Sequence, residues 1–250
     1  MANWSDPRTG AAYAATDVRA DAYDAGLRAY MLSVYNYMLS GVLLTAIISM
    51  VVGNSSLIEL IVQQNANGGY SPTMLGWIVT LSPLAIVFAM SFGQERMSEG
   101  TLKTLFFVYA GLMGASLSTI FMAYTATSIA GVFFATAAGF AGLSLYGYTT
   151  KKDLSGFGTF LIMGLIGLIV ASIVNLFLQS GTMGLVISAI GVLIFAGLTA
   201  YDTQKIKSIY AHVAGTEMQG KVAIMGALNL YLDFINMFLF LLRLFGSSRD

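Results

Sequence analysis

The chain has 250 residues, of which 57% are hydrophobic and only 10% are charged, and its net charge is zero. Soluble domains carry about 25% charged residues, so the composition indicates a polytopic membrane protein, and the neutral balance gives no reason to expect nucleic acid as a partner. The absence of cysteine excludes disulfides, thiolate nucleophiles and cysteine metal sites, and the single histidine argues against a histidine metal site.

The first thirty residues are more polar than the rest of the chain and lack the short apolar core, after a basic start, of a cleaved signal peptide. Aromatic and apolar residues such as Tyr13, Val18 and Tyr23 are interleaved with charged residues. We expect residues 1–31 to form a cytoplasmic tail, either as an interfacial helix or as a disordered segment. Residues 32–246 would then form one membrane domain.

Seven stretches are apolar over about 20 residues, the length that a helix needs to cross a hydrocarbon layer of about 30 Å. They should be helical, because lipid offers no hydrogen-bond partner to an unpaired backbone. We therefore predict an all-α membrane protein, a seven-helix bundle, with a bend at Pro83 in the second segment. The predicted segments are 32–52, 74–92, 104–124, 129–148, 157–178, 184–204 and 222–243.

The basic residues alternate between the two sides of these segments. Ten of the twelve Lys and Arg residues precede the first segment or follow the second, fourth and sixth, whereas the opposite loops 53–73, 125–128 and 179–183 contain none. Only Arg243 and Arg249 remain, at the far end of the chain. The positive-inside rule therefore predicts a cytoplasmic N-terminus and an external C-terminus.

Two acidic residues lie in the last two apolar segments. Asp202 follows the run GVLIFAGLTAY, and Asp233 lies in AIMGALNLYLDFINMFLFLL with no basic residue within nine positions. An aspartate at the centre of a membrane helix costs about 3 kcal/mol on insertion scales, so it normally faces a partner or a water-filled cavity. Each could instead be an isolated polar residue that bonds locally or stays protonated. Because they occur on consecutive segments, we favour a coupled acid pair that titrates as one unit.

The predicted depths of the two aspartates differ. Asp202 lies three residues before Lys205, at the cytoplasmic end of its segment. Asp233 lies 12 residues after Lys221, about 18 Å along a helix that rises 1.5 Å per residue. The two side chains can therefore meet only if polar turns extend the helices beyond the apolar segments. The sequence DTQKIKSIY, which begins at Asp202, is compatible with such an extension.

Three strings resemble the signature regions of the Bax inhibitor-1 family, in its bacterial branch. They are TTKKDLS before the fifth segment, LTAYDTQKIK around Asp202 and ALNLYLDFINMFLFLLRLFG around Asp233. The resemblance covers about residues 30–246 and is most specific over the last two segments. It implies a seven-helix bundle of the bacterial inner membrane, with the last helix at the centre, that acts as a pH-sensitive calcium leak channel.

The resemblance also implies roles for single residues. In the family a pair of aspartates on the last two segments forms the pH sensor, and these positions match Asp202 and Asp233. An arginine near the cytoplasmic end of the second segment latches the pair, and Arg96, in FGQERMS, is the best match. Arg96 could also be an ordinary cytoplasmic residue that makes weak surface pairs with neighbouring glutamates.

A calcium path needs oxygen ligands, since calcium prefers six to eight of them. The middle of the first five segments contains no Asp or Glu, so a path would depend on the two aspartates, as candidate calcium contacts, and on neutral groups. The candidate neutral groups are Asn175, Asn229, Asn236 and backbone carbonyls. We expect calcium as the transported ion, and no resident metal or cofactor.

Two other classes of function compete with this interpretation. Some bacterial relatives are linked to a membrane-anchored ATP-dependent protease. The chain could therefore be a membrane-embedded modulator of such a protease, or a stress or cell-death regulator, without transport activity.

An intramembrane aspartyl protease would also carry two aspartates, and Tyr201-Asp202 matches its first motif. However, Tyr231-Leu232-Asp233 lacks the glycines of the second, Gly-x-Gly-Asp, and no Pro-Ala-Leu string follows, so we expect a protein that is not an enzyme.

Overall fold

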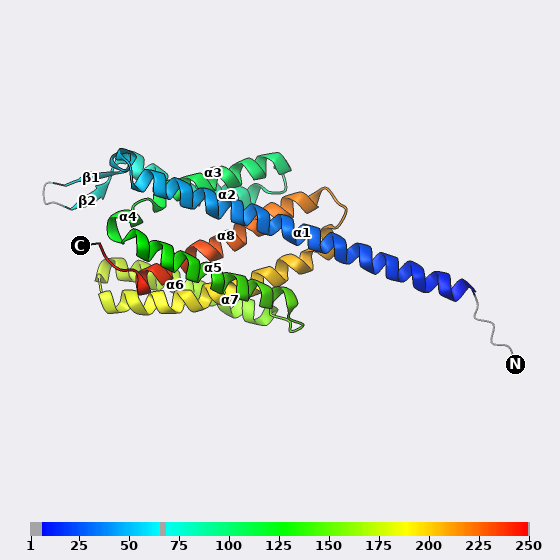
Figure 1. Ribbon diagram of the computed structural model, residues 1–250. Helices are drawn as coiled ribbons and strands as arrows, with labels where there is room; N and C mark the ends of the chain where they lie inside the picture. Colours follow the sequence, from blue (N-terminus) through cyan, green and yellow to red (C-terminus); the bar gives the residue numbers. More distant parts are fainter. Residues whose placement is uncertain (1–6, 66–68, 250) are drawn as a thin grey trace.

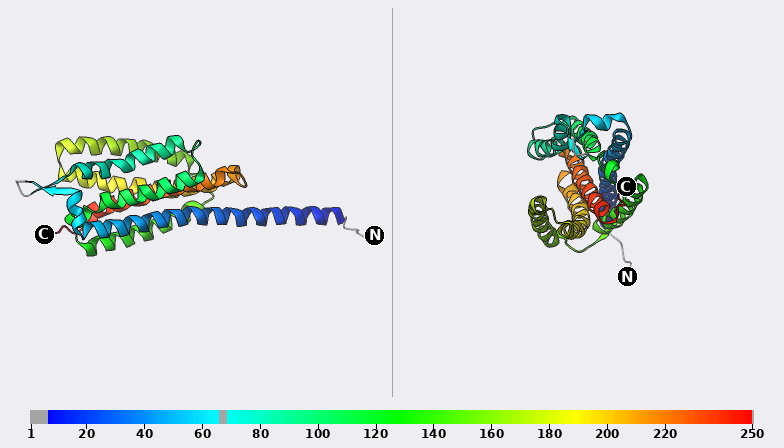
Figure 2. Two further views of the ribbon diagram at one scale, coloured as in Figure 1. Left: turned by 90° about the horizontal axis from the view of Figure 1, so that it is seen from above. Right: turned by 90° about the vertical axis from the view of Figure 1, so that its left-hand side faces the viewer.

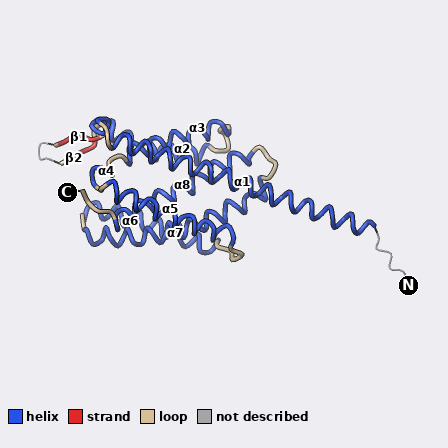
Figure 3. Tube along the Cα trace, in the orientation of Figure 1, coloured by secondary structure: helices blue, strands red, loops and turns tan. Residues whose placement is uncertain are grey.

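The computed structural model describes the backbone of residues 7–65 and 69–249, and their side chains from residue 22 onward. Helices make up most of the described chain and are joined by short connections (Figures 1 and 3). Seven helical regions in this part of the chain are long and apolar enough to cross a membrane, which confirms the predicted all-α bundle. The long helices are α1 (Pro7–Gly53), α2 (Met74–Gly93), α3 (Glu99–Leu117), α5 (Ala126–Thr149), α6 (Ser155–Leu178), α7 (Gly181–Val213) and α8 (Met218–Phe245).

The helices extend well beyond some of the predicted apolar segments. α1 runs without a break through residue 31, where the sequence suggested that a tail ends, and its first part projects from the bundle (Figure 1). The side chains of Tyr30 and Met31 are already buried in the core. The third predicted segment is divided, because a turn at Ser118 and Thr119 separates α3 from the short helix α4 (Ile120–Ala123). The start of α1 and the end of α8 lie at opposite ends of the molecule (Figure 2).

Side-chain caps begin several of the helices. The hydroxyl oxygens of Thr73, Ser98 and Ser180 each accept a hydrogen bond from the backbone N–H three residues later, at the first turn of α2, α3 and α7. These bonds satisfy N–H groups that have no partner inside the helix, which matters most where the surroundings are apolar. The caps explain why α3 begins at Glu99 rather than at residue 104, and α7 at Gly181 rather than at residue 184.

α8 is the central helix of the bundle, as predicted. It packs against α1, α3, α5 and α7, and 61% of its membrane-spanning stretch is buried, against 11% for α6. The end-on view in Figure 2 shows α8 surrounded by the other helices. Ile224, Leu228, Tyr231 and Leu242 are among its fully buried side chains. The outer helices α2 and α6 expose large apolar side chains instead, which suits a surface that faces lipid.

Glycines allow two pairs of helices to approach closely. Gly147 on α5 packs directly against the backbone of Ala200 on α7. Gly114 on α3 faces α1, where an added Cβ atom would come within 2.7 Å of the carbonyl oxygen of Thr45. A side chain at either position would push the helices apart, because in a membrane such contacts depend on backbone proximity.

The end of the bundle near the C-terminus carries a small extramembranous structure that sequence reasoning missed. A 3₁₀ helix (Ser56–Leu60) leads to strand β1 (Val62–Gln64), which pairs antiparallel with β2 (Tyr70–Pro72). The last residues of the chain return to the same end, where the Arg249 guanidinium donates a hydrogen bond to the Phe121 carbonyl. Three-residue strands carry too short a hydrophobic pattern to be predicted from sequence.

Candidate functional site

The extension of α7 brings the two intramembrane aspartates to the same level. α7 continues through DTQKIKSIY to Val213, and α8 begins only five residues later, at Met218. Asp202 therefore lies about 17 Å before the end of α7, and Asp233 about 22 Å after the start of α8, at 1.5 Å per residue. Because the helices are antiparallel neighbours, the two carboxyl groups face each other within hydrogen-bonding reach.

The two aspartates differ in their surroundings. The side chain of Asp233 is only 4% exposed, and its Oδ2 atom has no hydrogen-bond partner among the described residues. Asp202 is partly buried, and its carboxyl group interacts electrostatically with the Lys205 ammonium. A buried carboxyl oxygen without a donor is costly, so a proton held between the two groups would stabilise the arrangement.

Both aspartates line the same cavity, which has a volume of about 720 Å³ and lies between α6, α7 and α8. Its walls are mostly apolar and come from α6, including Leu165 and Ile169, and from Leu198 on α7. The polar and charged lining residues are Ser172, Asn175, Tyr201, Asp202, Lys205, Asn229, Asp233, Asn236 and Arg243. The structure therefore brings the aspartates and all three predicted asparagines to one cavity.

The asparagines of α8 follow the helical period of Asp233. Asn229, Asp233 and Asn236 are spaced by four and three residues, so they share one face of the helix. The Asn236 amide donates to the backbone carbonyl of Leu232, one turn earlier on its own helix, at 2.8 Å. At the end of α6, the side-chain amide oxygen of Asn175 (Oδ1) accepts a hydrogen bond from the backbone N–H of Ser180. The cavity thus has a polar stripe along α8.

Two cations line this cavity that sequence reasoning did not assign to the site. Lys205 lies one turn after Asp202 on α7, and its ammonium is 5.9 Å from the centre of the Tyr201 ring. Arg243 lies toward the end of α8, with its guanidinium 5.9 Å from the centre of the Phe240 ring. The sequence could have indicated Arg243, because Asp233, Phe240 and Arg243 follow the helical period and therefore lie on one face of α8.

Arg96, the predicted latch, is not among the residues that line the cavity. It lies in the turn between α2 and α3, where its side chain is exposed and its backbone N–H bonds to the carbonyl of Gly93. The same turn contacts the start of α8, where the Lys221 ammonium donates to the Glu95 carbonyl at 3.4 Å. A latching role for Arg96 stays a prediction.

Within the described residues, no three His, Cys, Asp or Glu side chains gather where they could hold a metal ion. Any cation in the cavity would therefore meet at most the two aspartates together with amide and backbone oxygens. Tight calcium sites in proteins offer more charged ligands than this set.

The fold and the site define a class of protein: a polytopic helical membrane protein with a paired-carboxyl site beside its central helix. The family described as "Inhibitor of apoptosis-promoting Bax1" matches residues 27–250, and the chain belongs to this family. It is 45% identical to the inner membrane protein YbhL of Escherichia coli strain K12 over 227 residues, which are 90% of this chain and 94% of that protein. It is also 46% identical to the Rickettsia prowazekii protein RP147 over 228 residues, which are 91% and 93% of the two chains.

Proposed function

We propose that this protein is a pH-sensitive cation leak channel of the bacterial inner membrane, with calcium as the transported ion and Asp202 and Asp233 as the proton sensor. The observation that carries the proposal is that the two carboxyl groups, from consecutive helices, face each other in one cavity. Membership of the Bax inhibitor-1 family supports it, as does the name of the relative YbhL for the location.

The proposed gate works through the charge of the pair. While one proton is shared, the pair carries a single negative charge and the two helices stay together. When this proton leaves at higher pH, two like charges face each other, and at about 4 Å they repel by roughly 4 kcal/mol for an effective dielectric constant near 20. Because α7 and α8 form the walls of the cavity, their separation at this level would widen it.

The proposed path follows the polar stripe of α8. A calcium ion that loses part of its hydration shell would exchange it for oxygens of Asp202, Asp233, Asn229 and Asn236. No cofactor takes part, and apart from the bilayer and the ion no partner is needed for this function; nucleic acid has no place in it. The distribution of basic residues supports a cytoplasmic N-terminus and an external C-terminus.

The test is calcium flux in proteoliposomes that contain the purified full-length protein, measured with an enclosed calcium dye from about pH 6 to 8. Flux through the wild type should change with pH, and Asp202→Asn and Asp233→Asn should each remove this dependence. Asp153→Asn is the matched control, because Asp153 is exposed in the α5–α6 connection and lies outside the cavity. An unchanged pH dependence in both site variants would exclude this mechanism.

One observation favours a second candidate function, the modulation of a membrane-anchored ATP-dependent protease without transport. The first part of α1 projects beyond the bundle as a helix (Figure 1). Such a projecting arm would offer a partner a binding surface. Pull-down from solubilised membranes should then depend on residues 7–21, and deletion of this arm should leave calcium flux unaffected. Capture that does not depend on the arm, together with strong flux, would count against this candidate.

We also propose that the paired aspartates do not catalyse peptide hydrolysis. The glycine and proline motifs that accompany such catalysis in intramembrane aspartyl proteases are absent from the sequence. A cleavage assay with a model membrane-spanning substrate tests this point. Cleavage that is lost in Asp233→Asn would overturn it.

A further inference from the structure

A second hollow lies on a different side of α8, between α1 and α5. α1 packs against α3 and α8, and α5 packs against α7 and α8, so α8 forms the floor between them (Figure 1). We call this hollow the α1–α5 groove and define it by Met31, Tyr35, Met38, Ala137, Phe140 and Phe234. Its volume is about 620 Å³, which is within the usual range for small-molecule sites.

The groove is apolar along its length. Phe140 and Phe234, which line the groove, meet edge to face with their ring centres 5.6 Å apart, and Phe133, outside the groove lining, contacts Phe234 at 5.4 Å. The lining has little to offer a polar ligand, because the hydroxyl of Ser144 is already bonded to Thr203. Such a surface fits a hydrocarbon chain.

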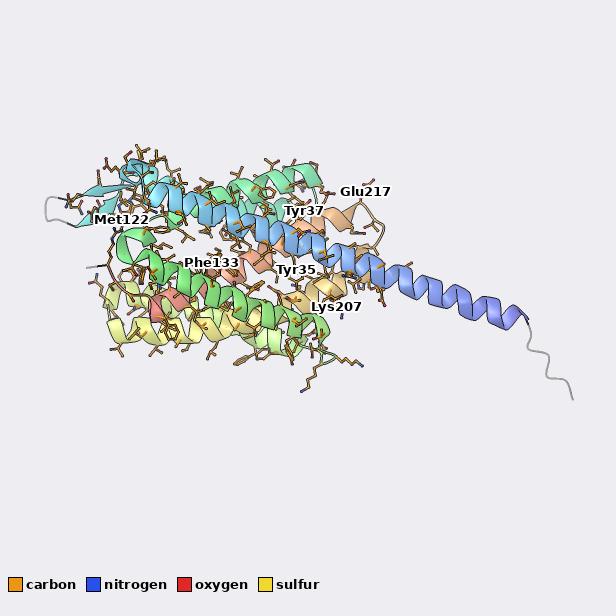
Figure 4. All side chains as sticks on the ribbon, in the orientation of Figure 1. Tyr35, Tyr37, Met122, Phe133, Lys207 and Glu217 are labelled. Atoms are coloured by element: carbon orange, nitrogen blue, oxygen red, sulfur yellow. The ribbon has the colours of Figure 1, made fainter. Side chains whose placement is uncertain are left out.

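Cations gather at only one end of the groove. Arg28 lines this end and is exposed. Lys207, from α7, reaches the same end: its ammonium lies 4.8 Å from the centre of the Tyr148 ring and donates to the Tyr148 carbonyl at 2.7 Å. Figure 4 shows Tyr35 and Lys207 near this end. An ammonium has three donors, so Lys207 can bind a phosphate oxygen while it keeps this bond.

The length of the groove matches one leaflet. From Arg28 to Leu39 on α1 is about 16 Å at 1.5 Å per residue, and half of a hydrocarbon layer of about 30 Å is about 15 Å. We propose that the α1–α5 groove binds one anionic phospholipid, with an acyl chain along the aromatic floor and the headgroup phosphate between Arg28 and Lys207. This site is separate from the aspartate pair, so it goes beyond the channel function and does not depend on it.

The charge arrangement favours a lipid over a second protein chain. Lipid has its charge at one end and hydrocarbon along the rest, and the groove shows the same pattern. A transmembrane helix from a partner would instead gain from small residues or hydrogen-bonding groups along the whole contact. Small residues line only the α5 wall, at Ala137, Ala141 and Ser144, whereas the α1 wall carries Met31 and Met38.

Native mass spectrometry of the purified full-length protein tests the proposal, with phosphatidylglycerol and phosphatidylcholine of identical acyl chains as probes. The wild type should retain one phosphatidylglycerol in preference to phosphatidylcholine. The double variant Arg28→Gln/Lys207→Gln should lower this preference about tenfold, because each basic residue near a membrane surface strengthens binding of anionic lipid severalfold. Lys151→Gln/Lys152→Gln removes the same charge from exposed positions and should leave the preference unchanged.

A second pair of variants tests the hydrocarbon part of the site. Ala137→Phe fills the groove and should reduce retention of both lipids, whereas Ala138→Phe, the next residue on the exposed side of α5, should not. Equal lipid retention in wild type, Arg28→Gln/Lys207→Gln and Ala137→Phe would overturn the proposal. Dimers that disappear in Ala137→Phe but not in Ala138→Phe would also overturn it, because they would assign the groove to a second copy of the chain.

Discussion

The two hollows beside α8 differ in kind although the same helix borders both. The cavity between α6, α7 and α8 contains a polar stripe and two carboxyl groups, whereas the α1–α5 groove is apolar with cations at one end only. Asp233 and Phe234 are adjacent in sequence, yet they line different hollows, because consecutive residues of a helix point in directions about 100° apart. A single central helix can therefore border an acidic, polar cavity on one face and an apolar groove on another.

The largest effect on stability should come from placing a polar side chain on the apolar face of α8. Phe234→Asn places an amide where the ring now contacts Phe133 and Phe140, and we expect it to lower the free energy of unfolding by about 3 kcal/mol or more. The neighbouring Asp233→Asn keeps a polar group in the polar cavity and should change stability by less than about 1 kcal/mol. Reversible unfolding in detergent measures both, and equal losses would contradict the distinction between the faces.

A smaller loss of stability should follow Thr45→Val on α1. The Thr45 hydroxyl is hydrogen-bonded to the Ala110 carbonyl on α3 and to the Tyr231 hydroxyl on α8, at 2.8 and 2.6 Å. Removal of these buried bonds should cost about 1–2 kcal/mol, while the pH dependence of flux stays unchanged. Thr104→Val on the exposed start of α3 is the control, since its hydroxyl bonds only within its own helix. A large change in the pH profile would show that the two faces of α8 are coupled.

Arg243→Gln tests how the charge of the cavity between α6, α7 and α8 affects calcium flux. Arg243 lines the cavity, and in the proposed channel its positive charge would oppose the passage of cations, so its removal should raise calcium flux about two- to fivefold, as expected for a solvent-exposed charge. Arg249→Gln removes an equal charge near the same end of the chain, but this residue bonds to Phe121 and does not line the cavity. Equal flux changes in the two variants would assign the effect to surface charge alone.

The smallest effect concerns Asp153, outside both hollows. Hydrogen bonds from Ser155 lower the pKa of this exposed carboxyl below its usual value. Its slight stabilisation is therefore present above the pKa of the unfolded chain and is lost as the pH falls through the lower pKa of the folded protein. Asp153→Asn should be marginally less stable than wild type at neutral pH, and the difference should vanish in acid. Thermal unfolding as a function of pH measures it, and a gap that widens in acid would contradict the assignment.

Sequence reasoning succeeded where the signal is local. Six of the seven predicted segments lie within a membrane-spanning helical region, and the third, 104–124, passes the end of its region by one residue, because hydropathy over about 20 residues is independent of the other helices. Asp202 and Asp233 could be selected from sequence because charge in an apolar segment is costly wherever the segment packs. The condition for their meeting, a helical DTQKIKSIY, could also be stated in advance, and α7 fulfils it.

Sequence reasoning gave no answer where the answer depends on packing. The position of Arg96 outside the cavity depends on how α2 and its turn lie against the bundle, which no local pattern encodes. The start of α3 at Glu99 depends on the cap that Ser98 provides beyond the apolar segment. In the sequence, the residues of the α1–α5 groove cannot be distinguished from ordinary lipid-facing or core residues. The groove exists only because α1 and α5 are spaced apart over α8.

The sequence by itself therefore determined that the chain crosses the membrane seven times, belongs to an all-helical class and carries two costly carboxyl groups, since each of these follows from the free energy of transferring a short segment into lipid. Only the tertiary structure decided that Asp202 and Asp233 share a cavity with Lys205 and Arg243, and that α1 and α5 leave a groove between them. The reason is that the rotation and spacing of neighbouring helices depend on close contacts such as Gly147 against Ala200, which join residues far apart in sequence.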